Sequence, residues 1–489
     1  MKKRIATSLL LVAMLASASC GSKTTTDTPV LSDSTTTAPS DSTTAAVETI
    51  DPLMDDLGEF DFENYEYRVL SVTYDPNSYF TLFDSEENGE VLNDALVRRN
   101  LEIEERFNVQ FVASEDSYGN NYTTLQKSVR SNEHAYDMIQ LINRNAFAAA
   151  IDGQLMPISE LTYLDPDKDY YLHDVNEQLS IAGKQVLFYS EECLHAFQSS
   201  VVLLFNKEIA KDHNLGNYYD MVRDGTWTLD RYFSDSRLVC TDVNGDSMWD
   251  DSDLYGTAVC VDAYFPSIYN GTGELSIRKD EDGIPYFAAI SSEKMTEVVE
   301  RIIHELDSSK HLYYTESQSF AAPVTAFAQN ISLFTAAPIG RMTPLREMES
   351  DYGLLPFPKY DESQEQYYSR MVDGWLHVVP ITNPDPERTS VILEALASGS
   401  ARYVIPAYYD TILNNKVLRD EESIEMMEIV RNTRIIDLGE LPWYETVRVR
   451  YTTDLFYKRK GEFASLNAKI ATRIEKEINK TLDALDSIG

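Results

Sequence analysis

The sequence has few cations and few cysteines for its length. Its 489 residues include 42 Lys and Arg against 80 Asp and Glu, which gives a formal net charge of −38. This balance argues against nucleic-acid binding, which depends on cations that neutralise phosphates. Beyond Cys20 only Cys193, Cys240 and Cys260 remain, and no CxxC pair occurs. A Cys240–Cys260 bridge is conceivable, but the odd count favours buried free thiols.

Motifs of several enzyme classes are also missing. The sequence contains neither a G-x-S-x-G nucleophile elbow nor a P-loop, and His304-Glu305 lacks the second histidine of a zinc-protease helix. A glycoside hydrolase needs one pair of carboxylates at a set separation, and no pair stands out among 80 acids. We therefore expect a protein that is not an enzyme, with a secreted glycoside hydrolase as the alternative.

The N-terminus has the pattern of an export signal. It begins with MKKR, continues with a short apolar run over residues 5–15, and reaches small residues before Cys20. The pattern resembles a bacterial lipoprotein signal, although Ser17 stands where that signal prefers leucine; ordinary secretion is the alternative. We predict a signal peptide over 1–19 and a lipidated Ser/Thr-rich tether over 20–58. No later run is long enough for a transmembrane helix, so lipid alone would hold the protein at the extracellular face of the membrane.

The body alternates between strand and helix patterns. Strand patterns lie at 67–74, 109–114 and 136–142, and helix patterns at 90–108 and 121–131. This β-α-β-α-β order predicts an α/β fold with a doubly wound sheet. Ligands of such sheets bind beyond the carboxyl ends of the strands, which singles out the loops at 75–80 and 143–147. From about residue 385 the pattern is mostly helical.

Several longer motifs occur in a characteristic order. They are YDMIQLINRNAFAAAIDGQLMPIS (136–159), VVLLFNKEIAKDHNL (201–215), DGTWTLDRY (224–232), AFAQNISLFTAAPIGRM (326–342) and YGLLPFP (352–358). In this order they resemble the extracellular solute-binding proteins of bacterial ABC importers, of the sugar- or maltodextrin-binding type. The resemblance covers roughly residues 60–400 and rests on the order of the motifs.

The resemblance implies a two-lobe periplasmic-binding-protein-like fold of type II, in which hinge closure captures a solute between the lobes. It implies lobe one at 59–165 and 305–345, lobe two at 166–304 and 346–400, and a helical region at 401–489 packed on both. It further implies a monomer that delivers a mono- or oligosaccharide to ABC importer permease subunits. A surface glycan-docking lipoprotein without transport is a further alternative.

A sugar needs planar polar side chains for its hydroxyls and aromatic rings for its faces. The resemblance assigns hydroxyl contacts to Asn143, Arg144 and Asn145, which lie beside Phe147; the alternative for Arg144 is a simple ion pair. Trp375 is expected to stack on the ligand, with core packing as its alternative. The remaining candidates are Arg341, Tyr74, Tyr79 and Gln198.

Residues 242–253 have the ligand spacing of an EF-hand calcium loop. Oxygen-bearing side chains stand at positions 1, 3, 5, 9 and 12, and position 7 would contribute its backbone carbonyl. In order these residues are Asp242, Asn244, Asp246, Asp250 and Asp253, with Met248 at position 7. Ser247 replaces the usual glycine at position 6, and Asp253 the usual glutamate at position 12. The spacing predicts structural calcium, and a polar turn without metal is the alternative.

Overall fold

The computed structural model describes most of the chain beyond residue 51. The described residues are 52–73, 83, 86–117, 119–308, 311–314, 320–414, 417–458 and 461–488. The predicted signal peptide, Cys20, Tyr74 and Tyr79 lie outside these residues. None of the described helices is long and apolar enough to cross a membrane.

The first sheet has four strands in the order β14-β3-β1-β2. Its strands are β1 (Tyr65–Thr73), β2 (Val109–Ser117), β3 (Met138–Ile142) and β14 (Trp375–Val378). β1 runs parallel to β2 and β3, whereas β14 runs antiparallel to β3. Every residue of β3 is buried, as expected of a strand covered by helices on both faces. This sheet confirms the predicted doubly wound pattern in the N-terminal half.

Helices connect and cover these strands. They are α1 (Val91–Phe107), α2 (Asn120–Ser131), α3 (Asn143–Ile151) and α12 (Pro386–Gly399). α1 ends at Asn108, whose backbone has the left-handed conformation (φ 51°) and donates to the carbonyl of Glu104. Asparagine tolerates this conformation better than most residues, so the chain turns directly from α1 into β2.

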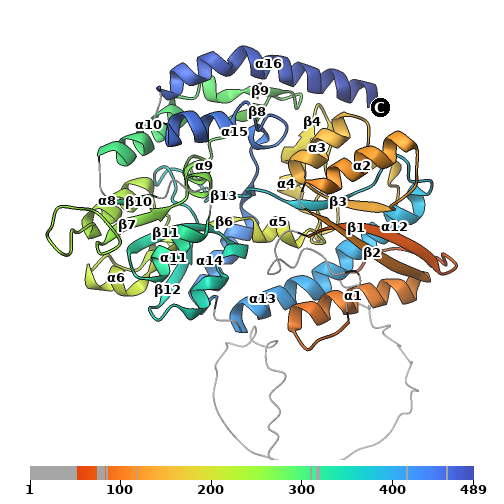
Figure 1. Ribbon diagram of the computed structural model, residues 1–489, viewed down its shortest axis with the longest axis horizontal. Helices are drawn as coiled ribbons and strands as arrows, with labels where there is room; N and C mark the ends of the chain where they lie inside the picture. Colours follow the sequence, from red (N-terminus) through yellow and green to blue (C-terminus); the bar gives the residue numbers. More distant parts are fainter. Residues whose placement is uncertain are drawn as a thin grey trace, which may run out of the picture. The chain divides into compact units, whose positions relative to one another are not determined.

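The second sheet has five strands in the order β10-β7-β11-β6-β12. The strands are β6 (Val201–Asn206), β7 (Tyr255–Val259), β10 (Leu312–Tyr314), β11 (Ser332–Pro338) and β12 (Tyr352–Leu355). The helices around them include α8 (Leu229–Val239), α9 (Val261–Gly271), α10 (Glu293–Ser308) and α11 (Ala321–Ala328). Figure 1 shows the two sheets side by side, the second on the left and the first on the right.

The expected division of the chain between the lobes needs a correction. β11 lies within 305–345, which we expected in lobe one, but it pairs with β6 and β7 of the second sheet. β14 lies within 346–400, which we expected in lobe two, but it pairs with β3 of the first sheet. Both strands are buried along their length, and a pattern of burial does not specify which distant strand will accept a strand's hydrogen bonds. The chain returns to the first lobe only after β12.

Three segments run beside one another between the sheets. Residues 199–200 lead into β6, β13 (Ser369–Arg370) leads towards β14, and β15 (Arg434–Ile435) lies in the C-terminal region. Ser200 bridges to Met371, and β13 pairs in parallel with β15. We call these hydrogen-bonded segments the crossover; β13 is labelled between the two sheets in Figure 1.

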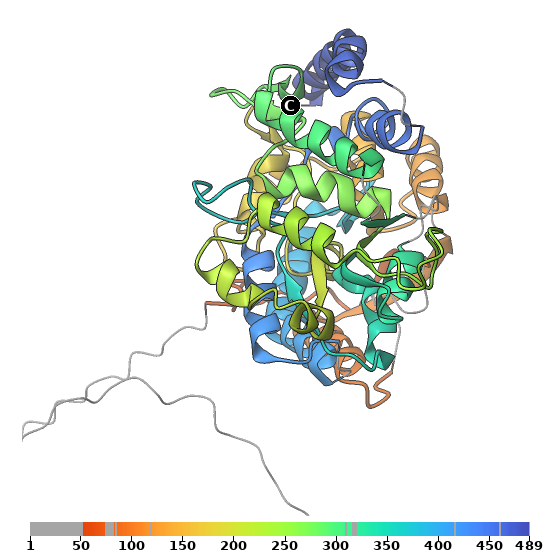
Figure 2. The same ribbon diagram turned by 90° about the vertical axis from the view of Figure 1, so that its left-hand side faces the viewer.

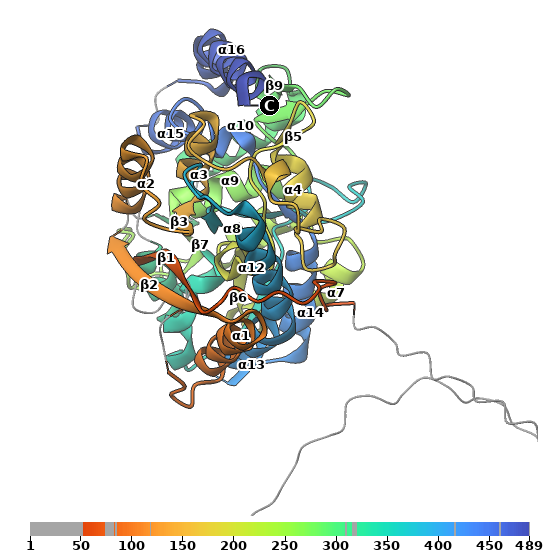
Figure 3. The same ribbon diagram turned by 90° about the vertical axis from the view of Figure 1, so that its right-hand side faces the viewer.

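The C-terminal helical region contacts both lobes. Its helices are α13 (Ile405–Asn414), α14 (Glu421–Asn432), α15 (Arg448–Arg450) and α16 (Phe463–Ile488). α13 packs on α1, and α14 packs on β12. α16 contacts α10 on the second-lobe side and α3 on the first-lobe side, and it lies at the top of both side views (Figures 2 and 3).

Candidate functional site

The carboxyl end of β3 presents two polar side chains. β3 ends at Ile142 and α3 begins with Asn143, so this turn lies where the strand-end rule expects a ligand. The Asn143 backbone N–H donates to the carbonyl of Gly374, which fixes the turn against the segment before β14 (2.8 Å). Asn143 itself is 1% exposed and lies beside the Tyr189 hydroxyl. Asn143 therefore stabilises the turn from its buried side.

Arg144 lies on the more open side of the same turn. Its Nη1 donates to Asp373 Oδ1 at 2.9 Å, and its guanidinium lies 5.2 Å from the ring centre of Tyr444. Both members of the ion pair are partly exposed. The ion pair that we weighed as an alternative is therefore present. Asp373 stands two residues before the start of β14, and Arg144 stands two residues after the end of β3. The ion pair therefore lies where these two neighbouring strands meet the loop.

The aromatic candidates differ from expectation. Phe147 is 1% exposed and belongs to the main hydrophobic core, which corrects the prediction that it faces a ligand. It follows Asn143 by four residues, and helix geometry places both on the buried face of α3. Trp375 is 3% exposed and packs with Val72 and Ile142. In this conformation Trp375 is a packing residue at the strand ends, and stacking on a ligand remains a prediction.

The second lobe meets this turn through α5 (Leu194–Gln198). α5 contacts β14 on one side and the 3-10 turn Ile339–Arg341 on the other. A Cβ atom added at Gly340 would lie 3.1 Å from Gln198 Cβ, so the glycine allows the close approach. Two sequence candidates, Gln198 and Arg341, thus come from elements that adjoin each other.

His195 connects the charged residues of the two sides. Its ring lies 6.4 Å from that of Trp375. Burial lowers the pKa of His195 to about 4, with opposing contributions from the charges of Asp373 and Arg341. The imidazole is therefore neutral at pH 7, so one ring nitrogen can donate a hydrogen bond and the other can accept one.

The C-terminal region adds Tyr444 and Arg448. Tyr444 lies between two guanidinium groups, 5.2 Å from Arg144 and 5.3 Å from Arg448. We call the residues around this meeting point the junction cluster. Its members are Asn143, Arg144, His195, Arg341, Asp373, Trp375 and Tyr444.

Several solved structures resemble the fold of this chain. An ABC substrate-binding protein of Listeria monocytogenes in complex with cycloalternan has a TM-score of 0.55 at 13% identity, over 86% of this chain and 99% of that chain. The GacH receptor of Streptomyces glaucescens, solved unliganded and with acarbose, has a TM-score of 0.54 at 12% identity, over 84% and 99%. A cyclo/maltodextrin-binding protein complexed with maltotetraose has a TM-score of 0.54 at 12% identity, over 87% and 98%.

This chain has the solute-binding-protein fold. The predicted two-lobe α/β architecture is thereby confirmed. No protein-family model matches the chain, and no curated protein matches it in sequence.

Sequence reasoning missed three members of the junction cluster in this solute-binding-protein fold. Asp373 directly precedes the Gly374-Trp375 pair that we singled out, so its neighbourhood was a usable signal. His195 and Tyr444 lie in segments without any strand-end pattern, and only the folded chain brings them to Arg144. Asn145, which we did predict, is half-buried in the first turn of α3.

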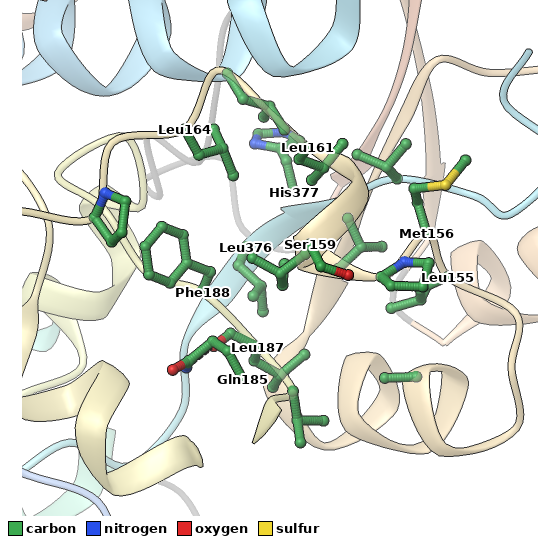
Figure 4. Close-up of a pocket in the computed structure, with 18 of the residues that line it drawn as sticks. Leu155, Met156, Ser159, Leu161, Leu164, Gln185, Leu187, Phe188, Leu376 and His377 are labelled. Carbon is green, nitrogen blue, oxygen red and sulfur yellow. Dashed lines mark hydrogen bonds between the residues drawn. The ribbon is translucent and has the colours of Figure 1, made fainter. Parts of the chain in front are cut away.

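A large cavity shares no residue with the junction cluster, although its lining residue Leu376 directly follows Trp375 in β14. It has a volume of about 680 Å³, and most of its lining residues are apolar, among them Leu155, Leu161, Leu187 and Leu376. Figure 4 labels the polar Ser159, Gln185 and His377 among these side chains. Lys184, Ser190 and Glu192 also line the cavity, and Glu192 Oε1 lies 2.6 Å from His377 Nδ1. A sugar carries hydroxyls around its whole edge and needs several convergent polar partners. The junction cluster brings polar groups of both lobes together, and we take it as the candidate ligand site.

In the calcium-like loop, the carboxylates accept hydrogen bonds from the loop's own backbone. Asp242 accepts hydrogen bonds from the backbone N–H groups of Gly245 (2.7 Å) and Ser247 (2.8 Å). Ser247 has φ 66°, so position 6 takes the sharp-turn conformation for which an EF-hand uses glycine. The buried Asp253 accepts from the N–H groups of Val243 and Asp250, both at 3.0 Å.

Because the carboxylates are engaged in these contacts, calcium binding by the loop remains a prediction. Within the described part of the chain, no three His, Cys, Asp or Glu side chains are grouped so as to hold a metal ion. Asp246 and Asp250 instead bond the backbone N–H groups of Met248 and Ser252. Binding would thus require the loop side chains to turn towards a common centre. The three described cysteines are free thiols; Cys193 and Cys260 are buried, as expected, whereas Cys240 is only half-buried.

Removal of calcium tests this loop directly. If the loop binds calcium, excess calcium should raise the melting temperature over that in EDTA, by an amount equivalent to about 2.7 kcal/mol at a hundredfold excess over Kd. We expect Asp246→Asn to lose this response and Asp282→Asn, in another exposed turn, to retain it. Differential scanning calorimetry measures both, and identical melting curves in calcium and EDTA would exclude the metal.

Proposed function

We propose that this protein is a lipid-anchored extracellular solute-binding protein that captures a mono- or oligosaccharide and delivers it to an ABC importer. Three solved proteins of the same fold are bound to cycloalternan, acarbose and maltotetraose. The carrying observation is the junction cluster, in which first-sheet residues, α5 and the end of β11 come together beside the crossover. The lipid anchor rests on the sequence around Cys20.

Capture would proceed by motion about the crossover. The lobes are joined there by short hydrogen-bonded segments, which are the places where a few backbone dihedrals can absorb a hinge rotation. A solute stabilises the closed form only through contacts that the open form lacks. Arg144 lies on the first lobe and Arg341 on the second, so a solute held between them would provide such contacts.

The chemistry of the cluster suits hydroxyl groups. The Arg144–Asp373 pair offers donors and acceptors that already face each other (2.9 Å), and a hydroxyl can donate to one and accept from the other. Neutral His195 adds one ring nitrogen that can donate a hydrogen bond and one that can accept it. We expect binding without turnover. Solved proteins of this fold include substrate-binding proteins, and the junction cluster contains a single carboxylate where glycoside hydrolysis needs a pair.

Titration calorimetry with maltotriose, maltotetraose and tagatose tests the proposal. For an oligosaccharide that binds to the wild type, Arg144→Met should weaken the protein's affinity on the order of tenfold to a hundredfold, because hydrogen bonds to a charged group contribute about 1.5–3 kcal/mol. Its matched control is Arg130→Met, which removes an exposed arginine of α2 in the same lobe. Equal affinity losses in both variants, or release of shorter sugars from the ligand, would contradict the proposal.

A further inference from the structure

A second cavity lies beside the crossover. It has a volume of about 350 Å³ and is lined mostly by polar residues, including Glu191, Arg431 and Arg434. Arg434 belongs to β15, which pairs with β13. The cavity shares no residue with the junction cluster, so a ligand bound there would occupy a separate site.

Arg434 is a buried cation to which the described residues offer no carboxylate partner. It is 8% exposed, and its Nε donates to the backbone carbonyl of Arg431 at 2.9 Å. Among the described residues, none accepts a hydrogen bond from its two terminal nitrogens, and none forms an ion pair with it. Burial lowers the pKa of Arg434, and neighbouring Arg431 adds to this while Glu191 opposes it. A buried charge left in this state is costly.

The buried acid of the cavity is already engaged. Glu191 Oε1 lies 2.6 Å from Arg431 Nη2, and the Glu191 side chain is 9% exposed. Arg434 and Glu191 are buried and Arg431 is partly exposed, so these three groups together leave one positive charge in excess. Asp169 and Asp174 also line the cavity, but both are exposed, so water screens much of their effect.

We propose that this cavity binds a small molecule through one carboxylate group, which Arg434 holds at the floor. A guanidinium presents two parallel N–H donors that match the two oxygens of a carboxylate. The volume accommodates more than the carboxylate itself, and ligand sites of this size are common. The exposed Asp169 and Asp174 disfavour a multiply charged anion, which is why the assignment is a monocarboxylate and not phosphate.

Thermal unfolding in acetate, phosphate and chloride at one ionic strength tests this site on the full-length protein. For the wild type we expect a saturable rise in melting temperature in acetate over chloride. Arg434→Met should lose this rise, and in chloride it should melt at or above the wild-type temperature because a buried unpaired cation has been removed. Arg434→Lys keeps the charge without the two parallel donors, so half-saturation should need on the order of tenfold more acetate.

Arg346→Met is the matched control, since Arg346 is an exposed arginine paired with its neighbour Glu347. It should retain the full acetate response. The inference is overturned if the wild type responds equally to acetate and chloride, if phosphate alone gives a saturable rise, or if Arg434→Met responds like the wild type. A large loss of stability of Arg434→Met in chloride would also overturn it, because the guanidinium would then have its partner within the chain.

Discussion

Arg370→Met is expected to lower the free energy of unfolding by about 3–5 kcal/mol, the cost of leaving a buried charge unpaired. Arg370 and Glu440 are 0% and 2% exposed, and their closest atoms, Nη2 and Oε2, are 2.7 Å apart. Nε of Arg370 also donates to Glu440, and Nη1 donates to the backbone carbonyl of Asp262 at 2.9 Å. One side chain thus joins β13, α9 and the C-terminal region at the crossover.

A second substitution separates the charge from the loss of packing. In Arg370→Met the Glu440 carboxylate keeps only the more distant Arg448, whose Nη1 lies 3.9 Å from Oε2. Adding Glu440→Gln removes this weakly paired carboxylate, so we expect the double variant to recover about 1–3 kcal/mol, the range of coupling for residues in direct contact. Urea denaturation of the wild type and the three variants completes the cycle. If the two single losses simply add in the double variant, the pair is not coupled and the loss in Arg370→Met has another cause.

Arg223→Met tests the same kind of loss at an arginine whose ion pairs are exposed. Arg223 pairs with Asp220, Glu422 and Glu425, but its side chain is 35% exposed. Exposed ion pairs contribute little because water and salt screen them, so the loss should stay within about 1 kcal/mol. A larger loss for Arg223→Met than for Arg370→Met would mean that burial does not decide the energetics of these pairs.

The sequence predicted elements well where burial imposes a local pattern. β3 is a run of five apolar or buried residues, and its end correctly located the turn with Asn143 and Arg144. The phase of α3 was also readable: residues four apart share a helix face, so Asn143 and Phe147 are buried together while Arg144 points elsewhere. Applied strictly, that rule would have removed Phe147 from the candidates.

Pairing between distant segments could not be predicted in this way. The sheet membership of β11 and β14 depends on hydrogen bonds to strands far away in the chain. Tyr444 reaches Arg144 across 300 positions of sequence, and no local pattern announces this contact. Trp375 fits a buried strand and a ligand platform equally well, since both need a large apolar surface. Only the packed structure distinguishes these cases.

His195→Gln should make stability less dependent on pH between about 4 and 6.5. Burial lowers the folded-state pKa of His195 to about 4, whereas an unfolded histidine titrates near 6.5. Between these values the unfolded chain binds one more proton, so this residue's contribution is complete above pH 6.5 and is lost as the pH falls towards 4. A shift of this size corresponds to about 3 kcal/mol.

The measurement is the difference between the wild type and His195→Gln in urea unfolding at pH 7.5, 6, 5 and 4.5. A difference is needed because other buried groups titrate in the same range. His311 also has its pKa lowered to about 4, and burial with the charge of Glu440 raises the pKa of Asp437 to about 6. Asp437 acts in the opposite direction: its contribution is complete below the unfolded pKa near 4 and is lost as the pH rises through 6.

Both of these groups remain in His195→Gln, so their effects cancel in the difference. We expect the stability advantage of the wild type over the variant to shrink by about 3 kcal/mol from pH 7.5 to 4.5, less the part still to be lost below pH 4.5. His311→Gln provides a second buried histidine away from the junction cluster and should show a similar slope. A difference that stays constant with pH would mean that His195 titrates alike in the folded and unfolded chains, and that the imidazole at the meeting point of the lobes is not held neutral by burial.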